Sequence, residues 1–130
     1  MADLLLDSHA VIWAINEPER LGASSREALV DPGNRVIVSA ASTWELTTKH
    51  RLGKLPGAGA MLATFHDSLD RLGAERLSIS HSHARLAGGM DWEHKDPFDR
   101  VLAAQAMIES LILVTLDQAF GTLAGLRTLW

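Results

Sequence analysis

Hydrophobic residues in this chain occur in two patterns, short continuous runs and longer stretches with helical spacing. Continuous apolar or β-branched runs are typical of buried strands, whereas apolar positions three and four residues apart mark one face of a helix. The first pattern predicts strands at residues 4–6, 35–40, 76–80, 111–116 and 126–130. The second pattern, with helix-start signals, predicts helices between these strands at 8–15, 42–55, 61–73, 82–90 and after Pro97.

The strict alternation of strands and helices indicates an α/β fold. We expect a three-layer α/β/α sandwich around a central parallel sheet of four or five strands, formed by one domain over residues 1–130. Within it, Ser42 is expected to cap the helix at 42–55, and Gly53 to end it. The last strand, at 126–130, is expected at an edge of the sheet.

Composition narrows the classes of protein that fit. Hydrophobic residues make up 47% of the chain and charged residues 22%, a balance ordinary for a globular domain, and there is no cysteine for a disulfide framework. The apolar start lacks a basic leader, and no apolar run approaches the ~20 residues of a membrane span, so we expect no signal peptide, no membrane and a cytoplasmic location. A formal charge of -4 excludes nucleic-acid binding through a generally basic surface.

Four acidic residues follow the predicted strands. Asp7 and Asp117 come directly after strands, whereas Glu45 and Asp99 lie in the first turns of helices. Ligands of open parallel sheets bind beyond the carboxyl ends of the strands, where these side chains would meet. Two carboxylates ~5 Å apart repel by roughly 1 to 3 kcal/mol. A cluster of four therefore needs a compensating cation, and oxygen ligands suit Mg²⁺ or Mn²⁺.

Each acid also has a purely structural interpretation. Asp96 before Pro97 is typical of a helix N-cap, and we expect capping as its main role. Asp99 would complement the positive end of the same helix. Asp7 and Asp117 would cap the segments that follow them, and Glu45 alone would be a routine first-turn acid. Only the coincidence of the four favours a shared site.

Four stretches together, "LLLDSH", "SAASTWEL", "HKDPFDRVLAAQA" and "LVTLD", resemble PIN-domain ribonucleases, in particular the VapC toxins of type II toxin–antitoxin systems. The resemblance implies a PIN-like fold, a Mg²⁺-dependent endoribonuclease with Mn²⁺ as a substitute, a homodimer, and a small VapB-like antitoxin as partner. It assigns catalysis and metal binding to Asp7, Glu45, Asp99 and Asp117, with Asp96, Ser8 and Thr115 as auxiliary residues. Ser8 stands where threonine is frequent, and Leu116 where a polar residue is frequent, which affects substrate preference more than chemistry.

Four basic residues, Lys49, Arg51, Lys54 and Arg100, form the candidate local patch for the RNA backbone, with a solvated helix end as the alternative. His81, His83 and His94 match a transition-metal site poorly and are expected to be exposed. The four tryptophans, Trp13, Trp44, Trp92 and Trp130, are expected in core or interface packing rather than stacked on RNA bases, Trp44 above all.

Three other functions remain open at this level. A phosphohydrolase of the haloacid dehalogenase type also has an aspartate after its first strand, but it needs a second one two positions later, where this chain has His9. A response-regulator receiver needs adjacent acids after that strand, and only Asp7 is present. A binding module would use the acidic pocket to receive a basic segment of a partner. Metal-dependent RNA cleavage separates the nuclease from this last alternative.

Overall fold

The computed structural model, which describes residues 1–130, contains a five-stranded sheet in which every neighbouring pair of strands is parallel. The strand order is β3-β2-β1-β4-β5. The strands are β1 (Asp3–Leu6), β2 (Arg35–Ser39), β3 (Ala74–Leu77), β4 (Ile112–Val114) and β5 (Thr128–Leu129). The predicted parallel sheet is therefore confirmed with five strands, and the last segment of the chain is an edge strand as expected.

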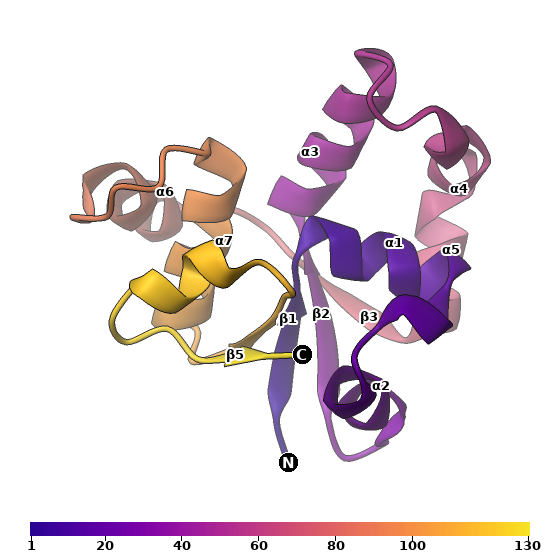
Figure 1. Ribbon diagram of the computed structural model, residues 1–130, viewed down its shortest axis with the longest axis horizontal. Helices are drawn as coiled ribbons and strands as arrows, with labels where there is room; N and C mark the ends of the chain where they lie inside the picture. The colour runs from indigo at the N-terminus through magenta and orange to yellow at the C-terminus, as the bar shows by residue number, and fades with distance from the viewer.

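Helices lie on both sides of this sheet, which confirms the three-layer architecture (Figure 1). One side carries α1 (Ser8–Asn16), α2 (Ala23–Val30), α4 (Gly59–Ala63) and α5 (Phe65–Leu72), and the other carries α6 (His81–Gly89) and α7 (Pro97–Ile108). Helix α3 (Ala40–Arg51) leaves the carboxyl end of β2 directly. Three 3-10 turns complete the chain: η1 (Pro18–Arg20), η2 (Pro56–Ala58) and η3 (Gln118–Thr122). No helix is both long enough and apolar enough to span a bilayer.

Alternate residues of the central strands supply the two layers of core. Leu4 and Leu6 of β1 pack in the cluster with α1 and α5, whereas Leu5 between them packs in the cluster with α7. All three leucines are fully buried. Because side chains of a strand point alternately to opposite faces, a sheet covered on both faces needs apolar residues at every position. The continuous apolar runs of the sequence have this cause.

Several predicted boundaries were wrong, and β4 and β5 are shorter than the strands predicted at 111–116 and 126–130. Helix α3 begins at Ala40, and its cap is Ser39, whose hydroxyl accepts a hydrogen bond from the Ala41 amide at 3.0 Å. Ser42 therefore lies inside the first turn, buried and without a hydrogen-bond partner. The end at Gly53 was placed correctly, since this glycine has a φ of 77°, a value that favours glycine after a helix.

Two further differences lie between α3 and α6. The helix predicted at 61–73 is two helices, α4 and α5, separated at Thr64, whose backbone leaves the helical region. Strand β3 starts two residues earlier than predicted, because Gly73 ends α5 with a φ of 71° and the chain enters the sheet at Ala74. None of these shifts moves an acidic residue of the predicted site to another element.

Candidate active site at the carboxyl edge of the sheet

The carboxyl ends of three neighbouring strands bring the predicted site residues to one edge of the molecule. Asp7 follows β1, and its amide donates to the Val114 carbonyl at the end of β4 at 3.1 Å. Glu45 is on α3, which follows β2, and Asp99 is on α7, which packs against α3. Figure 1 shows α1, α3 and the loop after β4 starting from this edge. The topology therefore gathers acids that are distant in sequence.

Asp7 is held on both carboxylate oxygens. Its Oδ1 accepts a hydrogen bond from the Ala10 amide at 2.8 Å, which caps α1, and its Oδ2 accepts one from the Thr115 hydroxyl at 2.5 Å. Only 7% of the residue is exposed. Burial raises the pKa of Asp7 above its usual value of 3.8, although the bonds from Thr115 and Ala10 and the charge of His9 act in the opposite direction. The Glu45 charge raises this pKa further, so the two carboxylates share one electrostatic field.

Glu45 is also buried and doubly bonded. Its Oε1 accepts a hydrogen bond from the Ser8 hydroxyl and its Oε2 one from the Lys49 ammonium, each at 2.5 Å. Burial lowers the pKa of Lys49, but the bond to Glu45 and the nearby carboxylates outweigh this effect and raise it above its usual value. The carboxylates that act on Lys49 include Asp96 and Asp99, so the acids of α7 lie near the pair of Lys49 and Glu45 on α3.

Asp99 has the most perturbed carboxyl group of the site. Burial is the largest cause, and with the charges of Asp96 and Glu45 it raises the pKa of Asp99 to about 6, against the opposing effect of His94. His94 Nε2 lies 2.7 Å from Asp99 Oδ2 and hydrogen-bonds to it. Asp96 Oδ1 accepts hydrogen bonds from the Phe98 amide at 2.9 Å and the Asp99 amide at 3.1 Å, which confirms Asp96 as the N-cap of α7.

Asp117 lies at the periphery of this group. Its side chain is exposed and caps η3 by accepting a hydrogen bond from the Ala119 amide at 2.9 Å. The Thr115 hydroxyl, which donates to Asp7, also accepts a hydrogen bond from the Asp117 amide at 3.0 Å. Asp7 and Asp117 line one cleft of about 300 Å³ with His9, Trp13 and Leu116. Thr115 therefore connects Asp117 to Asp7 through two hydrogen bonds.

The four acids do not form a ready cage. No group of three or more histidine, aspartate or glutamate side chains is arranged to hold a metal ion jointly. Their oxygens bond instead to Ser8, Lys49, Thr115, His94 and backbone amides. Three acids, Asp7, Glu45 and Asp99, are coupled electrostatically, and Asp117 joins them only through Thr115. Metal binding by the four therefore stays a prediction.

Two of the predicted RNA-contacting residues are engaged within the chain. Lys49 forms an ion pair with Glu45 across one helical turn, a spacing that the sequence displays and that could have been interpreted as a pair. Arg100 donates hydrogen bonds to four backbone carbonyls, those of Ala87, Met90, Trp92 and His94, at 2.6 to 2.9 Å. These bonds fasten the loop before α7, so Arg100 has a structural role, and its contact with the RNA backbone stays a prediction.

The other two basic residues are exposed and form no ion pair, as a surface patch requires. Lys54 lines a cleft of about 400 Å³ together with His9 and Trp13. The same two side chains line the cleft that contains Asp7 and Asp117. The two clefts are therefore neighbours, and Lys54 lies on the same surface as these acids. Arg51 lines neither cleft.

The expected exposure was wrong for two histidines, and one tryptophan lies outside the core. His81 is exposed as expected, but His83 is 3% exposed, and its Nδ1 accepts a hydrogen bond from the Ser80 amide at 3.0 Å in the cap of α6. His94 is half-buried against Asp99, a contact across Pro97 that no sequence pattern signals. Trp44, expected in core or interface packing, is 60% exposed and so lies outside the core, while interface packing stays a prediction.

Comparison with known proteins assigns the family. A family model for the PIN domain matches residues 4–126, and the chain therefore belongs to the PIN domain family. Ribonuclease VapC16 of Mycobacterium tuberculosis is 37% identical over 67 residues, which are 50% of this chain and 48% of that protein. The chain thus matches about half the length of this curated relative.

Solved structures show the same fold at lower identity. DNA-bound VapBC from Salmonella typhimurium contains a chain that is 20% identical, with a TM-score of 0.70 over 99% of this chain and 98% of that one. VapBC2 from Rickettsia felis, bound to a DNA fragment from its promoter, contains a chain that is 18% identical, with a TM-score of 0.68 over 98% of this chain and 97% of that one. These likenesses concern the fold of the whole chain.

Proposed function

We propose that this chain is a Mg²⁺-dependent endoribonuclease, active also with Mn²⁺, and the toxin of a toxin–antitoxin pair. One observation supports it above the others: two buried acids, Asp7 and Glu45, and a third with a pKa raised to about 6, Asp99, act on one another at the carboxyl edge of a PIN-domain sheet. Perturbed acids in a shared field are typical of functional sites. The relative named Ribonuclease VapC16 supports the choice of RNA as substrate.

The chemistry of the donors fits a hard divalent cation. All candidate ligands are carboxylate oxygens, which Mg²⁺ and Mn²⁺ prefer, and burial of Asp7 and Asp99 makes their charged forms costly without a cation. Asp7, Glu45 and Asp99 would hold the ion, with Asp117 at the rim. Such an ion, when bound, makes water a stronger nucleophile and offsets negative charge at a phosphate.

The residues around the acids position them. Thr115 and the Ala10 amide fix the Asp7 carboxylate, and Ser8 fixes that of Glu45. Lys49 neutralises Glu45 in the metal-free chain and is placed to stay as a cation beside a bound polyanion. His94 orients Asp99 through the bond to Oδ2. Lys54, on the surface continuous with Asp7, is the candidate contact for the RNA backbone.

The partners follow from the same proposal. The substrate is RNA, and the activity is blocked by a small VapB-like antitoxin, as the names of the structurally similar VapBC assemblies suggest. The toxin itself acts in the cytoplasm as a homodimer.

An aspartate-based phosphohydrolase fits less well. Such an enzyme needs a second acid two positions after Asp7, and His9 occupies that position. A binding module without catalytic activity is the stronger alternative to the ribonuclease, because the acids already have partners within the chain.

Incubation of the purified chain with total RNA separates these functions. We expect cleavage with millimolar Mn²⁺, no cleavage in EDTA, and ends that carry a 5′-phosphate and a 3′-hydroxyl. Asp7→Asn and Asp99→Asn should abolish cleavage, whereas Glu27→Gln, an exposed acid on α2, should cleave as the wild type does. RNA that stays intact in Mn²⁺ would favour the binding module.

A further inference from the structure

Trp44 is an exposed aromatic residue fixed at the rim of the acidic site. It stands one position before Glu45 on α3, and its ring meets that of Phe98 edge-on, with centroids 4.9 Å apart and an interplanar angle of 86°. Phe98 in turn stands one position before Asp99 on α7. The indole is therefore buttressed between the two helices that contribute acids, although 60% of it is exposed. Edge-on packing orients the ring without covering both of its faces.

A groove of about 440 Å³ begins at this indole and runs between α3, α5 and the end of β3. Its volume lies within the range of small-ligand pockets, about 300 to 1,000 Å³. The polar part of its lining consists of Thr43, Thr47, His66, Arg76 and Ser78. The groove thus offers one aromatic face, three hydroxyl groups and a guanidinium, a set that can stack on a ring and bond to polar edges.

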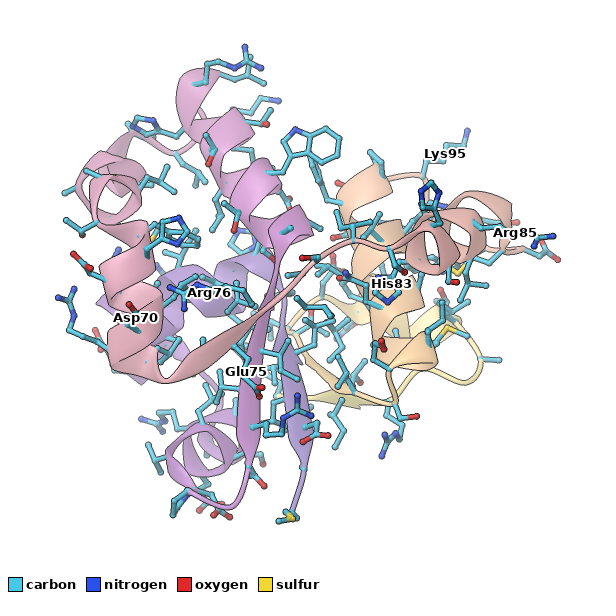
Figure 2. The ribbon with its side chains drawn as sticks, turned by 180° about the vertical axis from the view of Figure 1, so that it is seen from behind. Asp70, Glu75, Arg76, His83, Arg85 and Lys95 are labelled. Carbon is cyan, nitrogen blue, oxygen red and sulfur yellow. The ribbon has the colours of Figure 1, made fainter.

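Arg76 enters the groove in a fixed orientation. Its guanidinium donates to Asp70 Oδ1 at 2.7 Å and to the His66 carbonyl at 2.9 Å. Figure 2 shows Arg76 reaching from β3 toward α5, where Asp70 lies. Arginine has five N–H donors, and the others of Arg76 have no partner in the chain. A preoriented guanidinium with free donors suits a phosphate oxygen.

We propose that Trp44 and this groove bind a nucleotide of single-stranded RNA next to the scissile bond, with its base stacked on the indole and its phosphate contacted by Arg76. This inference rests on the proposed ribonuclease function and adds the residues that receive the strand. Arg76 favours this occupant, because the apolar face of a helix or of a second copy would leave its remaining N–H donors without partners, whereas a phosphate oxygen accepts from them. The indole N–H, which has no partner in the chain, is free to bond as well.

The test separates binding from cleavage. Affinity is measured in EDTA, where no cleavage is expected, with a labelled random-sequence 12-nucleotide single-stranded RNA and with inorganic polyphosphate as a base-free polyanion. Because stacking of one base contributes about 1 to 3 kcal/mol, Trp44→Ala should weaken RNA binding about tenfold. Binding of polyphosphate should stay within about twofold of the wild type, since a stacking surface has no base to receive. In Mn²⁺, the same variant should raise KM while kcat changes little.

Three further variants sharpen the result. Trp44→Phe should recover most of the RNA affinity, because a smaller ring still stacks. Arg76→Gln should weaken both RNA and polyphosphate. Val30→Ala, an exposed apolar residue on α2 at the opposite end of the sheet, is the matched control and should change neither.

The outcomes distinguish this inference from the proposed function. An RNA affinity and a KM that are unchanged in Trp44→Ala would overturn the inference. It would also be overturned if the only defect of this variant were a changed sedimentation coefficient, because Trp44 would then contact a second copy of the chain. RNA bound through Trp44 without any cleavage in Mn²⁺ would support the inference and refute the nuclease.

Discussion

The Thr115 hydroxyl donates a hydrogen bond to Asp7 Oδ2 at 2.5 Å, although the two residues are 108 positions apart in the chain. The bond joins the carboxyl ends of β1 and β4, which are neighbours in the sheet. It stabilises the charged form of a carboxylate that burial would otherwise neutralise. A hydroxyl after β4 therefore helps to keep the acid after β1 ionised.

Replacement of this hydroxyl should affect activity through the pKa of Asp7. In Thr115→Val the pKa of Asp7 should rise further, so the acid limb of the pH–rate profile should move to higher pH. Because a hydrogen bond to a charged group contributes about 1.5 to 3 kcal/mol, the free energy of unfolding at neutral pH should fall by a similar amount. Thr115→Ser keeps the hydroxyl and should behave as the wild type. A pH profile that is identical in Thr115→Val would refute this role.

The ion pair of Lys49 with Glu45 predicts competition with a metal ion. Lys49→Met leaves a buried carboxylate without its cation, so the metal-free chain should lose roughly 2 kcal/mol of stability, a value reduced by the partial exposure of Lys49. Mn²⁺ should then raise the melting temperature more in Lys49→Met than in the wild type, because the ion replaces the missing charge. In the double variant Lys49→Met with Glu45→Gln, Mn²⁺ should raise the melting temperature no more than in the wild type. Equal metal-induced shifts in all three proteins would contradict the prediction.

The raised pKa of Asp99 predicts a pH dependence of stability in EDTA. The folded chain holds a proton at Asp99 up to a pH of about 6, whereas the unfolded chain loses it near 3.8. The folded state thus binds more protons in this interval, so the contribution of Asp99 to stability is full below about pH 4 and is lost as pH rises through 6. Asp7 acts in the same direction. Urea midpoints between pH 4.5 and 7.5 should therefore fall less steeply in Asp99→Asn, while Glu27→Gln keeps the wild-type slope.

Arg100 should matter for stability rather than for direct contact with RNA. Lysine cannot reproduce four hydrogen bonds from one planar group, so Arg100→Lys should lower the free energy of unfolding by about 2 to 4 kcal/mol. Arg85→Lys is the control, because Arg85 is exposed on α6 and bonds to nothing (Figure 2). An Arg100→Lys chain with wild-type stability but weaker RNA binding would restore the interpretation as an RNA contact.

Short local patterns, such as an apolar run followed by an acid, sufficed to predict the sheet and the edge at which the acids gather. Continuous apolar runs such as Leu4–Leu6 have one structural explanation, burial on both faces, and an acid directly after such a run must lie at the carboxyl edge. The cap at Asp96 followed from a local rule as well. Local rules therefore placed Asp7, Glu45, Asp99 and Asp117 on the correct elements.

What the sequence could not predict depends on contacts between elements. Ser42 and Ser39 are both good caps, and only the point at which β2 leaves the sheet decides between them. Trp44 was expected in core or interface packing, but α3 extends beyond the sheet and 60% of this residue is exposed, so it is not part of the core. The bond of His94 to Asp99 requires the loop that Arg100 fastens, a geometry set by four carbonyls and by no motif.

Calorimetric titration of Mn²⁺ into the metal-free chain tests most directly whether the acids at the sheet edge share an ion. We predict at least one Mn²⁺ bound per chain, with an affinity that falls by about tenfold or more in Asp7→Asn and in Asp99→Asn, and that stays unchanged in Glu27→Gln. No binding at millimolar Mn²⁺, or one affinity common to all four proteins, would contradict a metal site built by these acids.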